Sequence, residues 1–449
     1  MLIGAAEDRV RQPTFAGAKA EMDLLVRAGF NAVRVTQTWA PGQARPRATD
    51  FRILHNVVRA AGLDGVKVLL TVMNFGSSTT PLTDGARAEF ASYAAALARG
   101  LPQVRYFVIG NEPNINRYWL PQFNPDGTDA AAPAYEALLA DSYDALKRVS
   151  SKILVLGGAL APHGGDRPNT IRPTHSPAAF LADLGAAYRA SGRMRPIMDA
   201  VAVHPYEDNS SVAPVDGRHP NSTTIAVADY DKLVALLATV FDGTAQRGST
   251  LPVYYDEFGV ESQIPPAKAS FYTGQEPVTV KPVPEAVQGE YYRQAIELAF
   301  CQPTVLGLFL FHAVDERDLG RWQSGLFYVD RTAKSDLAAV RTAMSEAHRG
   351  VVTECPGLAL RPRGSLAVSV RPLPARATLR CDIDCMYVVT VRRGSRVTGR
   401  VRGRALGGVA RRIRLGLRGS GTYTVQASLS APVNPGPPTV VRAVRFTVP

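Results

Sequence analysis

The sequence predicts an α/β fold, in which a (β/α)8 TIM barrel spans residues 1–350 and a small, all-β, sandwich-like domain spans residues 358–449. Three observations predict it. Short apolar runs alternate with helix-length segments through the first 350 residues. From about residue 358, alternating segments between Gly- and Pro-rich breaks replace this pattern. A length of 449 residues suits one barrel and one smaller unit.

Eight apolar runs provide the strands that a β/α barrel requires. Several of the runs are apolar throughout, as expected for parallel strands that are covered on both faces. The runs are residues 2–6, 32–36, 66–73, 105–110, 153–157, 200–203, 253–255 and 305–311.

Helical periodicity fills the intervals between these runs. Residues 15–28 place apolar side chains at helical spacing before Gly29, residues 229–241 do the same after a possible cap at Asp229, and residues 285–300 lead into the last strand. Long helix-poor connections follow three strands, at residues 161–177, 207–226 and 261–284. Because loops of this length are usually functional, we expect them to wall a cleft on one face of the barrel.

The C-terminal segment predicts five strands and contains few aromatic residues that could stack on sugars. Their ranges are 365–370, 386–391, 412–417, 422–428 and 440–448. No run of 18 apolar residues occurs in the chain, so no membrane-spanning helix is predicted.

The net charge of +12 belongs to the C-terminal segment. Residues 351–449 hold 17 Arg, no Lys and three acids, a net charge of +14, whereas residues 1–350 hold 34 basic and 36 acidic residues, a net charge of −2. A basic segment can bind an anionic cell-wall polymer. Nucleic acid is not expected, because no aromatic residues interleave with the arginines. A solvated arginine-rich surface without a partner is the alternative.

The four cysteines, Cys301, Cys355, Cys381 and Cys385, favour disulfides in an oxidising compartment. A Cys301–Cys355 pair would tie the end of the first domain, and four free buried thiols are the alternative. No cofactor or metal site is predicted, because the segment after residue 350 has no His and no metal-ligand spacing occurs elsewhere. The printed sequence begins on a strand with no visible leader. The protein is therefore either cytosolic or preceded by a leader, and the cysteines favour an extracellular or cell-surface location.

Two glutamates stand at the ends of predicted strands. Glu112 lies in Val-Ile-Gly-Asn-Glu-Pro-Asn (residues 108–114) and Glu257 in Pro-Val-Tyr-Tyr-Asp-Glu-Phe-Gly (residues 252–259). A β/α barrel keeps its chemistry at the C-terminal ends of its strands. Pro113 turns Glu112 away from helical geometry, and desolvation is expected to raise its pKa, as an acid catalyst requires. Glu257 needs hydrogen bonds that keep it ionised. The alternative is two structural glutamates that pair with arginines or cap helices.

Asn111-Glu112-Pro113 after the fourth strand, together with Asp-Glu-Phe-Gly after the seventh, resembles the clan A glycoside hydrolases, with family 5 and family 39 types nearest. The resemblance covers residues 1–350. It implies a retaining (β/α)8 O-glycosyl hydrolase with Glu112 as acid/base, Glu257 as nucleophile and Asn111 as the ligand of the sugar 2-hydroxyl.

Further residues match, or depart from, the family 5 pattern. Arg34 matches the second-strand arginine that orients the nucleophile, and His204 and Tyr206 match the His-x-Tyr element of the sixth strand. The tip of strand eight lacks the usual tryptophan, for which Trp322 could substitute as the floor for a sugar ring. Trp39 is either a subsite platform or a lid anchor.

These residues predict a secreted hydrolase that cleaves β-linked oligosaccharides, polysaccharides or glycosides by double displacement. The alternative is a catalytically inactive glycan-binding or cell-wall-attachment protein that keeps the barrel as a scaffold.

Overall fold

The computed structural model describes residues 1–350, 352, 355, 362–371, 374–381, 385–406, 409–417, 419–432 and 438–448. The chain divides into two compact units. The barrel unit comprises Met1–Phe300 and Thr304–Gly350, and the β unit comprises Cys301–Pro303 and Val351–Pro449.

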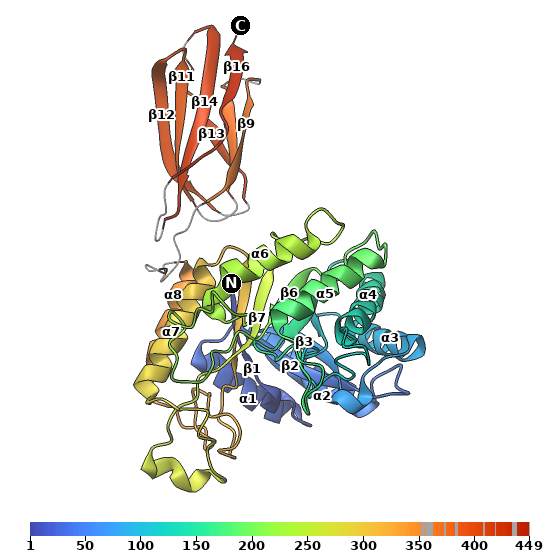
Figure 1. Cartoon of the computed structure of the whole chain (residues 1–449). Helices are drawn as coiled ribbons and strands as arrows, with labels where there is room; N and C mark the ends of the chain where they lie inside the picture. Colours follow the sequence, from blue (N-terminus) through green and yellow to red (C-terminus); the bar gives the residue numbers. More distant parts are fainter. Residues whose placement is uncertain are drawn as a thin grey trace. The chain divides into compact units, whose positions relative to one another are not determined.

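The barrel unit is a closed sheet of eight parallel strands in sequential order, which confirms the predicted (β/α)8 barrel (Figure 1). Strand β1 pairs with both β2 and β8, so the sheet has no free edge. The strands are β1 (Leu2–Ala6), β2 (Ala32–Trp39), β3 (Lys67–Asn74), β4 (Tyr106–Ile109), β5 (Leu154–Leu160), β6 (Ala200–Val203), β7 (Val253–Phe258) and β8 (Val305–Phe311).

A helix follows each strand along the chain. α1 matches its predicted range, because Thr14 caps its first turn and Gly29, at φ +101°, ends it. The helices are α1 (Phe15–Ala28), α2 (Ala48–Leu63), α3 (Asp84–Gly100), α4 (Ala131–Val149), α5 (Pro177–Ala190), α6 (Tyr230–Phe241), α7 (Glu285–Cys301) and α8 (Leu337–Arg349), with short 3-10 turns η1 (Asp8–Val10), η2 (Ser77–Thr79), η3 (Val227–Asp229) and η4 (Pro266–Phe271).

Buried apolar side chains fill part of the barrel interior, among them Leu69, Val108, Leu156 and Phe309. Gly4 leaves room for the Phe309 ring, because a Cβ at this position would lie 2.5 Å from the ring. The interior is therefore a packed core and leaves the C-terminal ends of the strands for chemistry.

The β unit contains two antiparallel sheets, which confirms the predicted C-terminal all-β domain. Buried residues of both sheets, such as Leu379, Val389 and Val425, share one core. One sheet has the order β13-β10-β9; the other has the order β12-β11-β14-β15, with β16 also paired to β14. Its strands are β9 (Gly364–Ser369), β10 (Arg376–Cys381), β11 (Cys385–Arg393), β12 (Arg396–Ala405), β13 (Arg411–Arg414), β14 (Gly421–Ser430), β15 (Thr439–Val440) and β16 (Val444–Val448).

The four cysteines form two disulfides, Cys301–Cys355 and Cys381–Cys385. This confirms the predicted disulfides, and the alternative of four free thiols does not hold. None of the described helices is long and apolar enough to cross a membrane.

Candidate active site

Glu112 is held at the end of β4 by an unusual backbone conformation. Gly110 and Glu112 both have positive φ, +82° and +44°. For a residue other than glycine this conformation is strained, and such strain concentrates at functional sites. The Glu112 amide donates to the Ala159 carbonyl at 2.8 Å, which ties the turn to β5. The sequence predicted a break from helical geometry before Pro113, but not this left-handed turn.

Glu257 and its neighbour Asp256 reach the same cluster because β7 is irregular. The pairing of β7 with β8 shifts between Tyr255 and Phe258, so that three residue steps on β7 oppose two on β8. An extra residue of this kind re-aims side chains, and such bulges are common beside active sites. Both carboxylates are consequently buried: the Asp256 side chain is fully buried and that of Glu257 is 11% exposed.

Arg34, on β2, connects both carboxylates of β7 to Asn111. Its guanidinium donates to Glu257 Oε1 at 2.6 Å and to Asn111 Oδ1 at 2.8 Å, and its Nε lies 3.1 Å from Asp256 Oδ2. Burial alone would lower the pKa of Arg34, but the charges of Glu257 and Asp256 outweigh it and raise that pKa. The cation therefore fixes the positions of the Glu257 carboxyl group and the Asn111 amide.

His204 bridges the two glutamates. Its Nδ1 lies 2.9 Å from Glu112 Oε1 and 3.5 Å from Glu257 Oε2, and its Nε2 lies 3.3 Å from Asp256 Oδ1. Burial would lower the pKa of His204, but the charges of Glu257 and Asp256 and hydrogen bonds to Asp256 and Glu112 raise it to about 10. The raised pKa favours the protonated ring at neutral pH.

Two tyrosines complete the polar surroundings of the glutamates. The Tyr206 hydroxyl donates to Glu257 Oε2 at 3.0 Å. Burial, followed by the charges of Glu257 and Glu112, raises the pKa of Tyr206 well above its ordinary value. Burial and then the charge of Glu112 raise the pKa of Tyr118 to about 12. Both phenols therefore stay protonated and can donate hydrogen bonds across the neutral range.

A cavity of about 450 Å³ is lined by Arg34, Asn111, Tyr118 and Glu257 of this cluster, whereas Glu112, His204, Tyr206 and Asp256 lie outside its lining. Its volume lies within the range of roughly 300–1,000 Å³ that is usual for small-ligand sites. Its polar wall comes from the ends of several strands and their loops, as expected on the C-terminal face of a barrel. The lining includes Glu7, Asp8, Arg34, Asn74, Phe75, Asn111, Arg117, Tyr118, Glu257, Phe311 and His312.

The structure excludes Trp39 as a subsite platform. The side chain is fully buried, its ring packs edge-on against Phe90, and its Nε1 donates to the Gln43 carbonyl at 3.0 Å. A ring without exposed surface cannot stack on a sugar, so Trp39 serves packing. Sequence alone could not separate these roles, because a tryptophan at a strand end suits either.

Trp322 lies beside the site and contacts its aromatic members. The ring centroid is 5.0 Å from that of Tyr206 and 5.2 Å from that of Phe311. It is Phe311, and not Trp322, that belongs to the cavity lining. Trp322 therefore supports the tyrosine that holds Glu257.

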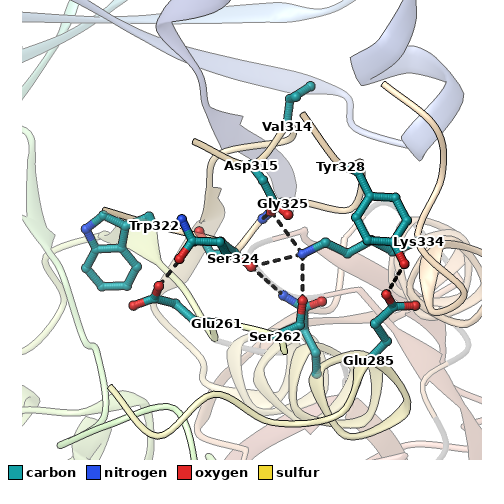
Figure 2. A network of polar contacts seen from close by, with 12 residues as sticks. Glu261, Ser262, Glu285, Val314, Asp315, Trp322, Ser324, Gly325, Tyr328 and Lys334 are labelled. Carbon is teal, nitrogen blue, oxygen red and sulfur yellow. Dashed lines mark hydrogen bonds and ion pairs between the residues drawn. The ribbon is translucent and has the colours of Figure 1, made fainter. Parts of the chain in front are cut away.

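A buried polar network anchors the loop that carries Trp322 (Figure 2). Lys334 Nζ lies 2.9 Å from Asp315 Oδ1 and donates to Ser262 Oγ at 2.8 Å and to the Gln323 carbonyl at 2.9 Å. The amide of Gln323 in turn donates to Glu261 at 3.2 Å. These bonds join the long loop after β7 to the loop after β8, so the wall near Trp322 is rigidly supported.

The site groups that could offer ligand atoms to a metal ion are Glu112, His204 and Glu257, whose nearest nitrogen and oxygen atoms all lie within 4.8 Å of one another. Arg34 already supplies a cation to Glu257, and protonated His204 supplies another. These positive charges oppose the binding of a divalent ion at the same oxygens.

The predicted residues Glu112, Glu257, Asn111, Arg34, His204 and Tyr206 therefore lie in one cluster. The sequence analysis assigned no role to Asp256, although it precedes Glu257 in the quoted motif. Regular strand alternation points neighbouring side chains to opposite faces, and only the bulge brings both carboxylates together. Phe75, Tyr118 and His312 were also missed, because no local sequence pattern marks a loop residue as cavity lining.

No protein-family model and no curated protein matches the chain. Solved structures do match it in fold. The chain is similar to a GH5_18 protein from Streptomyces cattleya in complex with Manβ1-4GlcNAc, with 18% identity, a TM-score of 0.53, and coverage of 80% of this chain and 83% of that one. It is also similar to a glucosidase from Croceicoccus marinus, with 12% identity, a TM-score of 0.52, and coverage of 92% and 93%.

A further match is Bacteroides uniformis β-glucuronidase 2, with 12% identity and a TM-score of 0.48. This chain spans 46% of the length of that protein. The matches above a TM-score of 0.5 confirm that the chain has a clan A glycoside hydrolase-like fold. At these identities the likeness concerns the fold alone.

Proposed function

We propose that the chain is a retaining glycoside hydrolase that cleaves β-linked O-glycosidic bonds by double displacement. One observation carries the proposal: Glu112 and Glu257 lie near the C-terminal ends of two strands of one barrel, and one carboxylate oxygen of each lies within 4.8 Å of one of the other. Retaining enzymes separate their carboxyl groups by about 5–5.5 Å and inverting enzymes by about 6.5–9.5 Å, and this close approach of two carboxylate oxygens supports the retaining arrangement.

In the first step, Glu257 attacks the anomeric carbon while Glu112 gives its proton to the departing glycosidic oxygen. A covalent glycosyl–enzyme ester forms and the aglycone leaves as an alcohol. In the second step, Glu112 takes a proton from water, whose oxygen attacks the anomeric carbon and releases Glu257 as a carboxylate. Both glutamates return to their starting protonation states.

The surrounding contacts fit these roles. Arg34 and Tyr206 each donate to a different oxygen of Glu257, which holds the proposed nucleophile in place. His204 Nδ1 lies 2.9 Å from Oε1 of Glu112, which leaves Oε2 for the leaving group. Asn111 accepts from Arg34 through Oδ1, so its NH2 group is available for a sugar hydroxyl.

The substrate that we propose is a short β-linked oligosaccharide, or the end of a polysaccharide, that enters the cavity. Phe311 and Tyr118 provide aromatic surface in its wall, with Trp322 behind Phe311 and Tyr206 as support. The structures of similar fold include proteins described with Manβ1-4GlcNAc and as a glucosidase, so β-mannosides and β-glucosides are the first substrates to test.

We also propose an extracellular or cell-surface location for the protein. The two disulfides support it, because such bonds persist in oxidising compartments.

The test is a panel of aryl β-glycosides and β-linked polysaccharides assayed with the wild type, Glu257→Ala, Glu112→Ala and the distant control Glu346→Ala. We expect turnover by the wild type and the control, and a loss of at least about 10³-fold with Glu257→Ala. Glu112→Ala should retain more activity on aryl glycosides with good leaving groups, which need less acid assistance. Glycan binding without turnover would support the non-catalytic alternative.

A further inference from the structure

Phe75 is an exposed aromatic residue in the cavity that contains the proposed nucleophile. The residue is 72% exposed and lines the cavity together with Glu257. Single exposed apolar residues are normal on a protein surface, and Phe271, which is 37% exposed, lies outside this lining. An exposed phenyl ring in the lining of a cavity, in contrast, offers a ligand an aromatic surface.

Hydrogen bonds between two loops hold the backbone around Phe75. The residue directly follows β3, whose last residue, Asn74, is buried and donates through Nδ2 to the Tyr118 carbonyl at 2.8 Å. On the other side of Phe75, the amide of Ser77 donates to the Arg117 carbonyl at 3.2 Å. Both bonds reach the loop after β4. A ring that is carried by such a fixed turn loses less conformational freedom when a ligand binds.

The residues that line the cavity indicate which part of a substrate it would hold. In the proposed mechanism Glu112 gives its proton to the oxygen of the leaving group, so the leaving group must contact Glu112. The lining includes Glu257 and Asn111 but not Glu112. The cavity therefore suits the glycone, which is the part of the substrate that becomes attached to the nucleophile.

The cavity offers room for more than one sugar of the glycone. Its volume of about 450 Å³ lies in the range for ligands of drug size, which are larger than a single pyranose ring. The Glu257 side chain is only 11% exposed and belongs to the floor of the cavity, whereas the exposed Phe75 lies at its mouth. A sugar whose anomeric carbon reaches Glu257 fills the floor, so the next sugar unit lies at the mouth.

We propose that Phe75 is the platform of a second glycone subsite, so that the preferred substrate carries at least two sugars before the cleaved bond. The proposal rests on the hydrolysis proposed above and adds the length of the substrate to it. The C–H groups on one face of a pyranose ring can pack against an aromatic ring, whose face is electrically negative. Arg117 is exposed on the neighbouring loop, lines the same cavity and can donate hydrogen bonds to hydroxyls of this second sugar.

The experiment compares kcat/KM for para-nitrophenyl glycosides that carry one sugar or two sugars and share the same leaving group. The pairs are β-glucoside with β-cellobioside and β-mannoside with β-mannobioside, and release of the intact disaccharide is measured for the two-sugar glycosides. The full-length wild type is assayed beside Phe75→Ala and Phe75→Trp. Phe271→Ala is the matched control, because it removes an exposed phenylalanine that does not line the cavity.

We expect the wild type to prefer the two-sugar glycoside of a pair by at least about tenfold in kcat/KM. Phe75→Ala should lower this preference at least about fivefold, because the second sugar loses its aromatic partner. Phe75→Trp keeps an aromatic face and should retain the preference. Phe271→Ala should change the preference by less than about twofold.

Equal losses on the one-sugar and two-sugar glycosides would overturn the proposal, because Phe75 would then act on the shared leaving group or on the fold. A wild type that hydrolyses both members of a pair equally well would overturn the second subsite and leave the proposed hydrolysis intact. Absence of turnover with every glycoside would overturn the hydrolysis and the subsite together.

Discussion

The Nε2 atom of His204 lies 3.3 Å from Oδ1 of Asp256, on a ring whose Nδ1 atom contacts Glu112. Both side chains are fully buried. Asp256 thereby fixes the imidazole that spans the two glutamates, and its second oxygen holds Arg34. Asp256 is therefore a positioning residue for the proposed acid/base and the proposed nucleophile together.

Replacement of Asp256 by Asn should lower kcat/KM by about 10- to 100-fold, because small misplacements of catalytic groups have effects of this size. It should also change the pH profile. The negative charge of Asp256 helps to raise the pKa of His204 to about 10, so its removal lowers that pKa. The imidazolium is then lost at lower pH, and the alkaline limb of kcat/KM moves toward neutrality.

Profiles between about pH 6 and pH 10 test this expectation. Asp199→Asn, which removes an ion pair with Lys147 ahead of β6, is the control and should leave the profile unchanged. A profile of Asp256→Asn that coincides with the wild type would contradict the positioning role.

Tyr206→Phe should weaken catalysis while leaving the aromatic packing in place. The substitution removes the hydroxyl that donates to Glu257 at 3.0 Å, but keeps the ring beside Trp322. A hydrogen bond to a charged group contributes about 1.5–3 kcal/mol, which corresponds to a loss of about 10- to 150-fold in kcat/KM. An effect below about twofold, with unchanged thermal stability, would show that the hydroxyl does not support the nucleophile.

Glu207→Gln should stabilise the protein at and above neutral pH. Burial, followed by the charges of Asp229 and Asp208, raises the pKa of Glu207 to about 9. A raised carboxyl pKa means that the folded state holds a proton that the unfolded state releases. Stability therefore falls as pH rises from the unfolded pKa of about 4.3 to about 9, by at most about 1.4 kcal/mol per pH unit.

The free energy of unfolding, measured by denaturant titration at several pH values, checks this prediction. The difference between Glu207→Gln and the wild type should grow from pH 5 to pH 9. The exposed control Asp84→Asn should show no such growth. A constant difference across this range would indicate that Glu207 is ionised in the folded protein.

Lys334→Met should destabilise the barrel unit by about 3–5 kcal/mol, because it leaves the buried carboxylate of Asp315 without its ion partner. Asp315→Asn in the same chain removes that stranded charge and keeps an oxygen for the Gly325 amide, which donates at 2.9 Å. The double variant should therefore be more stable than Lys334→Met alone. Thermal unfolding of the single and the double variant measures the difference. A double variant that is less stable than Lys334→Met alone would contradict the account.

The barrel could be predicted because the spacing of apolar residues along the chain reflects which side chains are buried in each strand and helix. Residues 15–28, 200–203 and 305–311 have the predicted bounds. Strand β12 was missed, because its exposed arginines and glycines conceal an alternation in which only Val401 and the terminal Ala405 reach the core. β10 was also missed, and residues 440–448 form two short strands in place of one.

The sequence could identify those site residues that lie near the C-terminal ends of predicted strands. His204 directly follows β6, Glu257 is the penultimate residue of β7 and Glu112 lies three residues beyond β4. The role of Asp256 depends instead on a bulge that no local sequence pattern predicts. Trp39 shows the converse problem. Its place at the end of a strand suggested that its ring lines the cavity. The ring instead packs against Phe90 in the core.

Covalent trapping tests the central claim most directly. The wild type is incubated with the 2-deoxy-2-fluoro-β-glycosyl fluoride of whichever sugar the substrate panel identifies, and the digested protein is analysed by mass spectrometry. The account predicts one glycosyl adduct per chain, on the peptide that contains Glu257, and none in Glu257→Gln. An adduct on another carboxylate, or turnover with inversion and without any adduct, would contradict it.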